Sequence, residues 1–294
     1  MDSPLDRIIQ WGEAQPHVRA MILTSTRAIP EGTVPGAVMD EFSDYDVILV
    51  VTDVMAFFPE RGWLAPFGEV LAMYRDPIDA ADGLPKFGAV VQFVGGLKID
   101  FTLWPVEMLR GLTEARDLPE ELDAGYRVLL DKDGRTANLQ PPSYHAYIPA
   151  LPGAERYRYE IENFFLTAIY YAKYTWRGDL MAARHVLETY MLQEHLRPML
   201  EWLVQIDHGG GVKAGLYGRG MQRWLRPELW ALLEQVYTGF TWEESWQALD
   251  AIVSLMRAAA AAVGKHLGFD YPQEIEKQAH AYIAQIQSTP RKAA

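Results

Sequence analysis

The chain reads Asp44-Tyr45-Asp46-Val47-Ile48-Leu49-Val50-Val51 where two carboxylates lead into a run of apolar, mostly β-branched residues. Such a short apolar run is typical of a buried strand. Residues two apart on an extended chain point to the same side, so Asp44 and Asp46 face one direction at the start of that strand. This stretch therefore predicts a sheet that carries paired acids at one end.

A third acid and a hydroxyl-rich turn accompany this strand. Asp100 interrupts an otherwise apolar strand, where an aspartate is costly to bury unless it is paired or binds a metal. Three acids at strand ends make an oxygen-only site, which Mg²⁺ favours together with substrate phosphates. The hydroxyls and amides of Ser25 and Thr26, in a turn after an earlier strand, suit terminal phosphates. Each piece alone also fits a surface turn or a water-facing edge acid, whereas their order along the chain favours the site.

The first half of the chain has the patterns of a mixed sheet with few helices. Short apolar runs are separated by Pro, Gly and Asp, and Gly95-Gly96 is a tight turn between two strands. We expect helices over 5–14 and 67–74 and strands over 20–23, 47–51, 89–94, 97–103 and 127–130.

The pattern changes near residue 150, after a proline-dense stretch that suits a linker. Helical periodicity then predicts helices over 155–175, 180–203, 227–236, 242–263 and 272–286, with stops at Gly178, the glycines 209–211, Gly264 and Gly268. The predicted fold class is therefore α+β, with a mixed-sheet domain over 1–150 and an all-helical bundle over 151–294.

Composition narrows the function classes. The chain has 27 basic and 39 acidic residues, hence a net charge of −12, and it has no cysteine. Cysteine-based catalysis and cysteine-ligated metals are excluded, and nucleic acid is disfavoured as a partner because backbone binding needs clustered basic residues. The charge suits a small cationic substrate, although an acidic surface also serves solubility. No apolar run approaches a membrane span and no signal peptide is visible, so we expect a cytoplasmic protein without a membrane partner.

The sequence resembles the aminoglycoside 6-adenylyltransferases, the streptomycin adenylyltransferase family within the polymerase-β-like nucleotidyltransferases. The resemblance is colinear over most of the chain. It is carried by the segments 24–27, 42–47, 98–103, 128–134, 162–165, 171–173, 176–177, 199–202 and 215–218. It implies a nucleotidyltransferase domain followed by a helical domain, acting in antibiotic resistance by moving AMP from Mg-ATP to a hydroxyl of an aminoglycoside.

The resemblance also implies roles for individual residues. Asp44 and Asp46 would be Mg²⁺ ligands, and Asp100 would be a third ligand or the general base. The triphosphate of ATP would contact the turn residues Ser25, Thr26 and Arg27 and, from the helical half, Lys173.

Glu162 is the alternative general base, and an ion pair with Lys173 or a neighbouring arginine is the structural alternative for it. The family pattern has Gly-Ser where this chain has Ser25-Thr26, so a side chain replaces a glycine that permits close phosphate approach.

Two further functions stay open on the sequence. The acceptor can be another small molecule, such as a lincosamide, or a protein hydroxyl. The altered turn at Ser25 also fits a catalytically silent nucleotide-binding protein.

Overall fold

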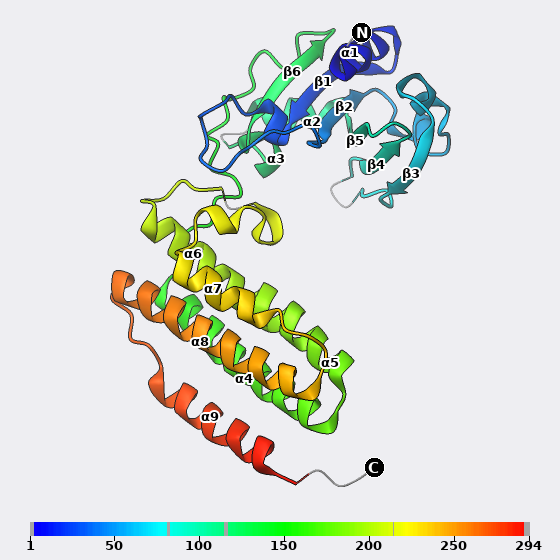
Figure 1. Ribbon diagram of the computed structural model, residues 1–294. Coiled ribbons are helices and arrows are strands. Elements are labelled where there is room, and N and C mark those ends of the chain that lie inside the picture. Colours follow the sequence, from blue (N-terminus) through cyan, green and yellow to red (C-terminus); the bar gives the residue numbers. More distant parts are fainter. Residues whose placement is uncertain (1–2, 81–82, 115–116, 214, 291–294) are drawn as a thin grey trace. The chain divides into compact units, whose positions relative to one another are not determined.

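The chain forms two compact units, Met1–Tyr147 and Ile148–Ala294, each with its own core (Figure 1). The computed structural model describes residues 3–80, 83–114, 117–213 and 215–290. The fold class predicted from the sequence, a mixed sheet followed by a helical bundle, is confirmed.

The first unit is built on a six-stranded sheet with the order β3-β4-β5-β2-β1-β6. Within it β2 and β5 are parallel, and the other neighbouring pairs are antiparallel. The strands are β1 (Val18–Thr24), β2 (Tyr45–Val51), β3 (Val70–Arg75), β4 (Phe87–Phe93), β5 (Lys98–Pro105) and β6 (Tyr126–Asp131).

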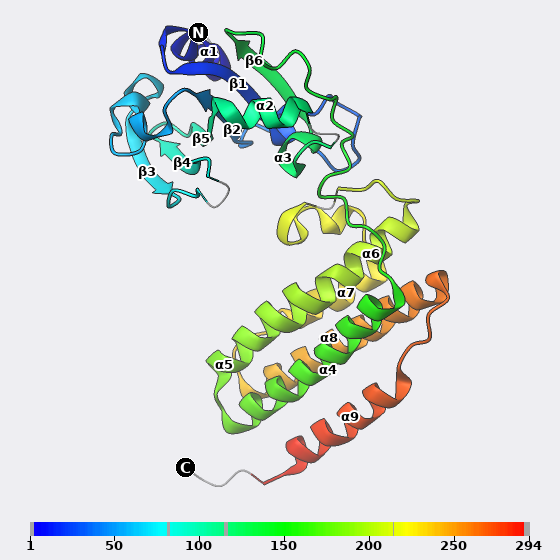
Figure 2. The ribbon, with the colours of Figure 1, turned by 180° about the vertical axis from the view of Figure 1, so that it is seen from behind.

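Both faces of the central strands are buried, which explains their unbroken apolar runs. One face of β1 and β2 packs with Ile8 and Trp11 of α1 (Pro4–Ala14) and with the 3₁₀ turn η3 (Gly62–Phe67). The other face packs with Leu109 of α2 (Val106–Glu114) and Leu122 of α3 (Glu120–Asp123), which Figure 2 shows from behind. Two helical layers therefore hold the strands that carry the predicted acids.

The helix predicted over Phe67–Tyr74 is wrong. The 3₁₀ turn η3 ends at Gly68, whose φ is 141°, and the chain continues as the edge strand β3, paired with β4. Leu71 and Tyr74 are exposed on this strand, so its apolar residues do not mark a buried helix face. Pairing with β4 makes residues 70–75 a strand, and the spacing of apolar residues in this segment does not indicate that pairing.

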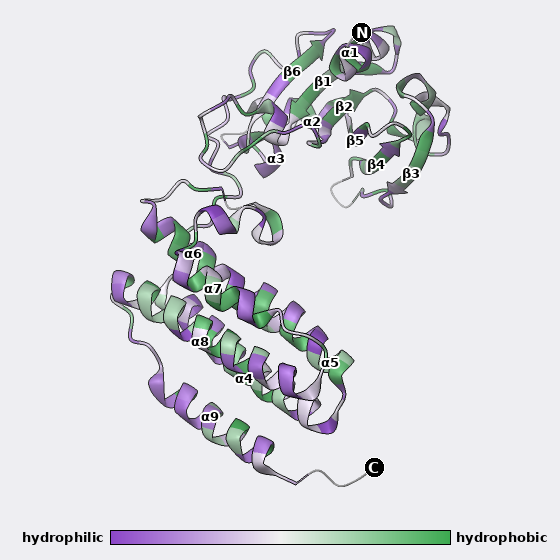
Figure 3. Ribbon diagram, viewed as in Figure 1, coloured by the Kyte–Doolittle hydropathy of each residue, from purple (hydrophilic) through white to green (hydrophobic). Residues whose placement is uncertain are grey.

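The second unit is a helical bundle. Its helices are α4 (Ala154–Arg177), α5 (Leu180–His185), η4 (Val186–Leu196), α6 (Arg197–Asp207), α7 (Pro227–Val236), α8 (Trp242–Leu267) and α9 (Gln273–Ser288), with short 3₁₀ turns over 216–218 and 221–223. Figure 3 shows hydrophobic residues along α8, which supplies much of the bundle core, and mostly hydrophilic residues along α9. By length and composition alone α8 could cross a membrane, but 61% of its most apolar window is buried in the protein, as in the core helix of a globular domain.

The predicted helix over 180–203 runs without a break, but its hydrogen-bonding pattern changes along its length. Its middle section, η4, is a π-helix, and the Arg197 N–H donates to the carbonyl of Leu192, five residues back. Pro198 follows directly, lacks an N–H and crowds the carbonyl four residues before it. The wider π hydrogen bonding accommodates this proline, as π segments within helices do.

Gly264 is not a helix stop, contrary to the sequence prediction. It lies inside α8, which ends at Gly268 in the left-handed conformation with φ 74°. A Cβ on Gly264 would lie 2.6 Å from the Tyr157 hydroxyl of α4 and 2.8 Å from the Phe269 carbonyl. The glycine therefore permits close packing of α8 on α4.

Candidate active site

The three predicted acids meet at one end of the sheet. In the parallel pair, Asp46 on β2 lies directly opposite Asp100 on β5. Thr24, the last residue of β1, lies opposite Asp46 on the other side, so the turn at Ser25 begins beside the acids. Asp44 immediately precedes β2.

Lys98 joins two of these acids. Its Nζ lies 2.5 Å from Oδ2 of Asp44 and 3.0 Å from Oδ2 of Asp100. Partial burial lowers the pKa of Lys98, but its hydrogen bonds to Asp44 and Asp100 outweigh that effect and raise it. Sequence reasoning assigned Lys98 no role, although Lys98 and Asp100 are two apart on a strand and so share a side, a spacing that could have identified the pair.

Asp46 is the acid that Lys98 does not contact directly. Burial, and then the negative charges of Asp100 and Asp44, raise the pKa of Asp46 to about 6, against the opposing effects of Lys98 and a hydrogen bond with Ser25. The raised pKa of Asp46 beside two other carboxylates shows an excess of negative charge, which a bound cation would offset.

The donor set suits a hard divalent cation. Oδ1 of Asp100 is buried and has no hydrogen-bond partner among the described residues, and all three groups are carboxylates. As the side chains stand, no three His, Asp or Glu residues of the described ranges are arranged as a ready metal site. The residues therefore fit Mg²⁺ chemically, and the ammonium of Lys98 lies between two of them.

The turn after β1 is held by its own contacts. Ser25 has φ 61°, the left-handed region that glycine favours, and it begins the 3₁₀ turn Ser25–Ala28. Thr26 is half-buried within this turn. Arg27 donates from Nε to the carbonyls of Ser43 (3.1 Å) and Asp44 (2.9 Å), and its guanidinium lies 4.1 Å from the centre of the Tyr45 ring. Arg27 thereby positions the segment that carries Asp44.

A cavity of about 450 Å³ opens beside Asp44, entirely within the first unit, and its lining does not include Asp46 or Asp100. Its lining includes the cations Arg7, Arg27 and Lys98, the acids Glu41 and Asp44, and Phe42, whose side chain is 83% exposed. Basic groups next to acidic ones at the end of a sheet are typical of a site for a metal-bound phosphate compound.

The chain matches known proteins over almost its whole length. A family model described as streptomycin adenylyltransferase matches residues 2–286. The chain belongs to this family. It is therefore a nucleotidyltransferase of the streptomycin adenylyltransferase family.

Individual proteins similar to this chain are named as aminoglycoside 6-adenylyltransferases. An aminoglycoside 6-adenylyltransferase of Campylobacter jejuni is 26% identical over 282 residues, which cover 95% of this chain and 93% of the relative. The corresponding Bacillus subtilis protein is 29% identical over 238 residues, covering 79% and 81% of the two chains. A crystal structure of an aminoglycoside 6-adenyltransferase from Bacillus subtilis aligns over 98% of this chain and 100% of its own, with 22% identity and a TM-score of 0.48.

Two residues predicted to act in this family member lie on α4, in the second unit. Nε of Arg158 lies 2.6 Å from Oε1 of Glu162, one helical turn away, which is the ion pair expected as the structural alternative. The ammonium of Lys173 lies over the rings of Tyr170 and Tyr282, at 5.9 and 5.3 Å, beside a cavity of about 210 Å³. Both residues thus have contacts within their own unit, and their catalytic and phosphate-binding roles remain predictions.

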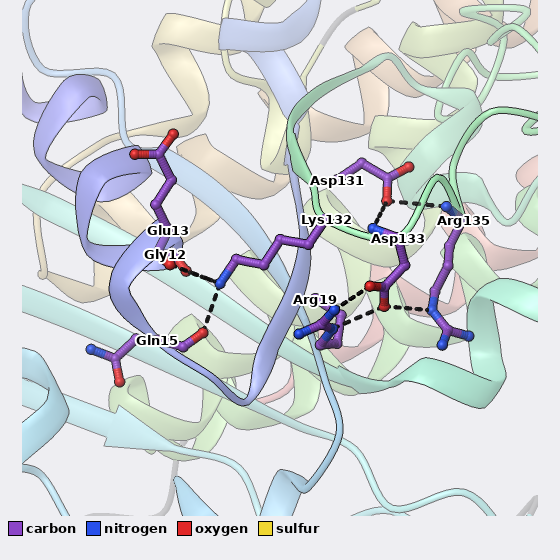
Figure 4. Close-up of polar contacts among 8 residues, drawn as sticks. All are labelled: Gly12, Glu13, Gln15, Arg19, Asp131, Lys132, Asp133 and Arg135. Atoms are coloured by element: carbon purple, nitrogen blue, oxygen red, sulfur yellow. Dashed lines mark hydrogen bonds and ion pairs between the residues drawn. The ribbon is translucent and has the colours of Figure 1, made fainter.

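The motif at residues 131–134 of this nucleotidyltransferase has a structural role (Figure 4). Nζ of Lys132 donates to the carbonyls of Gly12, Glu13 and Gln15 at 2.8, 2.9 and 2.8 Å. These carbonyls lie at the C-terminal end of α1, which has no basic residue in its last turn, so Lys132 supplies the missing cation.

The neighbouring Asp133 fixes the same turn. Hydrogen bonds from Arg19 and then Arg135 hold the pKa of Asp133 well below its usual range. The 131–134 motif thereby ties α1, β1 and β6 together and fixes the strand that leads to Ser25.

Proposed function

We propose that this nucleotidyltransferase moves AMP from Mg-ATP to a hydroxyl of an aminoglycoside of the streptomycin type and releases pyrophosphate. The observation that carries the proposal is the register of β2 and β5, which sets Asp46 opposite Asp100 with Asp44 close by. The names of the aminoglycoside 6-adenylyltransferase relatives support the acceptor class. The net charge of −12 suits a polycationic acceptor.

The roles of the residues follow from their positions. Asp44 and Asp46, with Asp100 as a third ligand or as the general base, would hold Mg²⁺, which when bound polarises the α-phosphate and offsets the charge of the leaving pyrophosphate. The phosphates would be bound by Ser25, Thr26 and Arg27, and by Lys173 from the second unit. The acceptor oxygen forms a bond to the α-phosphorus while the bond from that phosphorus to pyrophosphate breaks.

The proton of the acceptor hydroxyl goes to a carboxylate. Asp100 suits this role because its Oδ1 is buried and unpartnered among the described residues. Glu162 is the second candidate, although its ion pair with Arg158 must break before it can accept a proton. We assign nucleotide chemistry to the domain over 1–150 and acceptor contacts to the helical domain over 151–294, in a cytoplasmic enzyme.

The test is pyrophosphate release from Mg-ATP in the presence of streptomycin. We expect release by the wild-type protein, loss of at least about a hundredfold in Asp46→Asn, and no change in Asp250→Asn, which removes an exposed acid of α8. EDTA should abolish release.

Other outcomes identify the alternatives. Release with a lincosamide or a protein acceptor but not with streptomycin would contradict the proposed acceptor. Mg²⁺-dependent ATP binding without AMP transfer to any acceptor would favour a catalytically silent protein.

A further inference from the structure

Lys98 occupies one oxygen on each of two carboxylates that would hold a divalent cation. Its ammonium contacts Oδ2 of both Asp44 and Asp100, at 2.5 and 3.0 Å. An ammonium this close opposes a metal ion at the same carboxylates, because the two cations repel and compete for the negative charge. Lys98 therefore competes with any metal at this site.

The contact is also suited to holding the site together. Asp46 and Asp100 are fixed opposite each other by the strand ladder, and Asp44 lies two residues before Asp46. Carboxylates this close repel one another unless a cation lies among them. The side chains of Lys98, Asp44 and Asp100 are 29%, 36% and 29% exposed, so the ammonium can leave toward solvent without unfolding the sheet.

We propose that Lys98 is a resident counter-cation, which holds Asp44 and Asp100 in place in the metal-free protein and is displaced when a divalent cation binds. This inference rests on the metal site of the proposed function. The displaced ammonium remains in the wall of the cavity that it shares with Arg7 and Arg27. Metal binding thereby releases the charge of Lys98 from its carboxylates into a wall that already carries Arg7 and Arg27 and suits phosphate.

The experiment measures Mn²⁺ affinity by electron paramagnetic resonance, without nucleotide or acceptor. We expect Lys98→Met to bind Mn²⁺ at least about tenfold more tightly than the wild type, because the competing charge is gone. Lys98→Arg keeps the charge and should bind no more tightly than the wild type. Lys86→Met is the matched control, since Lys86 pairs with Asp79 at 3.5 Å elsewhere in the first unit, and its affinity should equal the wild-type value.

Thermal unfolding gives a second readout. In EDTA, Lys98→Met should melt several degrees below the wild type, and saturating Mn²⁺ should close that gap. If Lys98→Met does not fold without metal, the wild type still tests the idea: labelling of Lys98 by an amine-reactive reagent, followed by mass spectrometry, should speed up when Mn²⁺ is added, and labelling of Lys86 should not.

Equal or weaker Mn²⁺ binding by Lys98→Met, or labelling of Lys98 that Mn²⁺ leaves unchanged, would overturn the inference. Absence of Mn²⁺ binding to every variant would overturn it together with the proposed metal site. The proposed reaction fails separately if Mn²⁺ binds as expected and no pyrophosphate is released with any acceptor.

Discussion

Ser25 has a side chain at a backbone conformation that glycine favours, and the family pattern has glycine there. Left-handed φ costs an ordinary residue about 1 kcal/mol. Ser25→Gly and Ser25→Ala both lose the hydrogen bond to Asp46, but only glycine relieves the backbone. We expect Ser25→Gly to be more stable than Ser25→Ala by roughly 1 kcal/mol in urea unfolding. Equal stabilities would show that the turn is unstrained.

Asp46 makes the stability of the metal-free protein depend on pH. Its pKa is about 6 in the folded protein against an ordinary value of 3.8, so the folded state binds the proton more tightly than the unfolded chain. Between about pH 4 and 6 the free energy of unfolding should therefore fall as pH rises, by on the order of 2–3 kcal/mol from this group. Urea unfolding in EDTA measures this slope. Asp46→Asn should flatten it, and a slope unchanged in that variant would rule out Asp46 as its source.

At the scale of elements, Lys132 anchors α1 from a different part of the chain. Its three hydrogen bonds satisfy carbonyls that no residue of α1 neutralises. Lys132→Met should lower the free energy of unfolding by about 2 kcal/mol, the usual range for charged hydrogen bonds. Lys277→Met, which removes an exposed lysine 3.7 Å from Glu274, should change it by less than about 0.5 kcal/mol. Similar losses in both variants would contradict the anchoring role.

Two helical glycines should respond in opposite directions to alanine. Gly111 in α2 has no heavy atom within 4 Å of its missing Cβ, so Gly111→Ala should stabilise by up to about 1 kcal/mol through helix propensity. A Cβ added to Gly264 would lie 2.6 Å from the Tyr157 hydroxyl. Gly264→Ala should therefore destabilise the protein by about 1–3 kcal/mol, despite the same gain in helix propensity. Chemical denaturation of both variants tests this, and stabilisation by both would mean that α8 and α4 separate at little cost.

Elements with a strong local pattern were predictable, and those decided by distant contacts were not. The β4–β5 hairpin was predictable because Gly95 and Gly96 supply the positive φ that its turn needs. The edge strand β3 was not, because β4 provides its hydrogen bonds from residues 87–93. The π segment η4 has one signal in the sequence, Pro198, directly after the residue that closes it.

At the scale of the whole molecule, the sequence predicts which acids meet but not what lies between them. The order of turn, paired acids and third acid is readable because strand ends gather at one edge of a sheet. The bridging by Lys98 depends on side-chain distances of a few ångströms, which no spacing rule supplies. Likewise, nothing in the sequence around Arg7 indicates that its helix contributes to a cavity with Arg27.

The net charge of −12 should affect encounter with a polycationic acceptor. A negative field attracts such a molecule from a distance, and salt shortens the range of that field to about 10 Å at 0.1 M. For streptomycin, the acceptor proposed above, we expect kcat/KM to fall several-fold between about 20 and 200 mM salt, with kcat nearly constant. A kcat/KM that does not depend on salt would mean that the charge serves solubility alone.

The single parallel pair in the sheet has a consequence for how this chain can vary. Because β2 and β5 run in the same direction, residues 52–97 must cross from one end of the sheet to the other between them. The ladder, and not the length of that crossover, sets Asp46 opposite Asp100. That segment also forms β3 and β4, and β4 pairs with β5 beside Asp100. The exposed turn at residues 59–61, which precedes both strands, is therefore the place where a grafted tag or a cut would leave the acids in register.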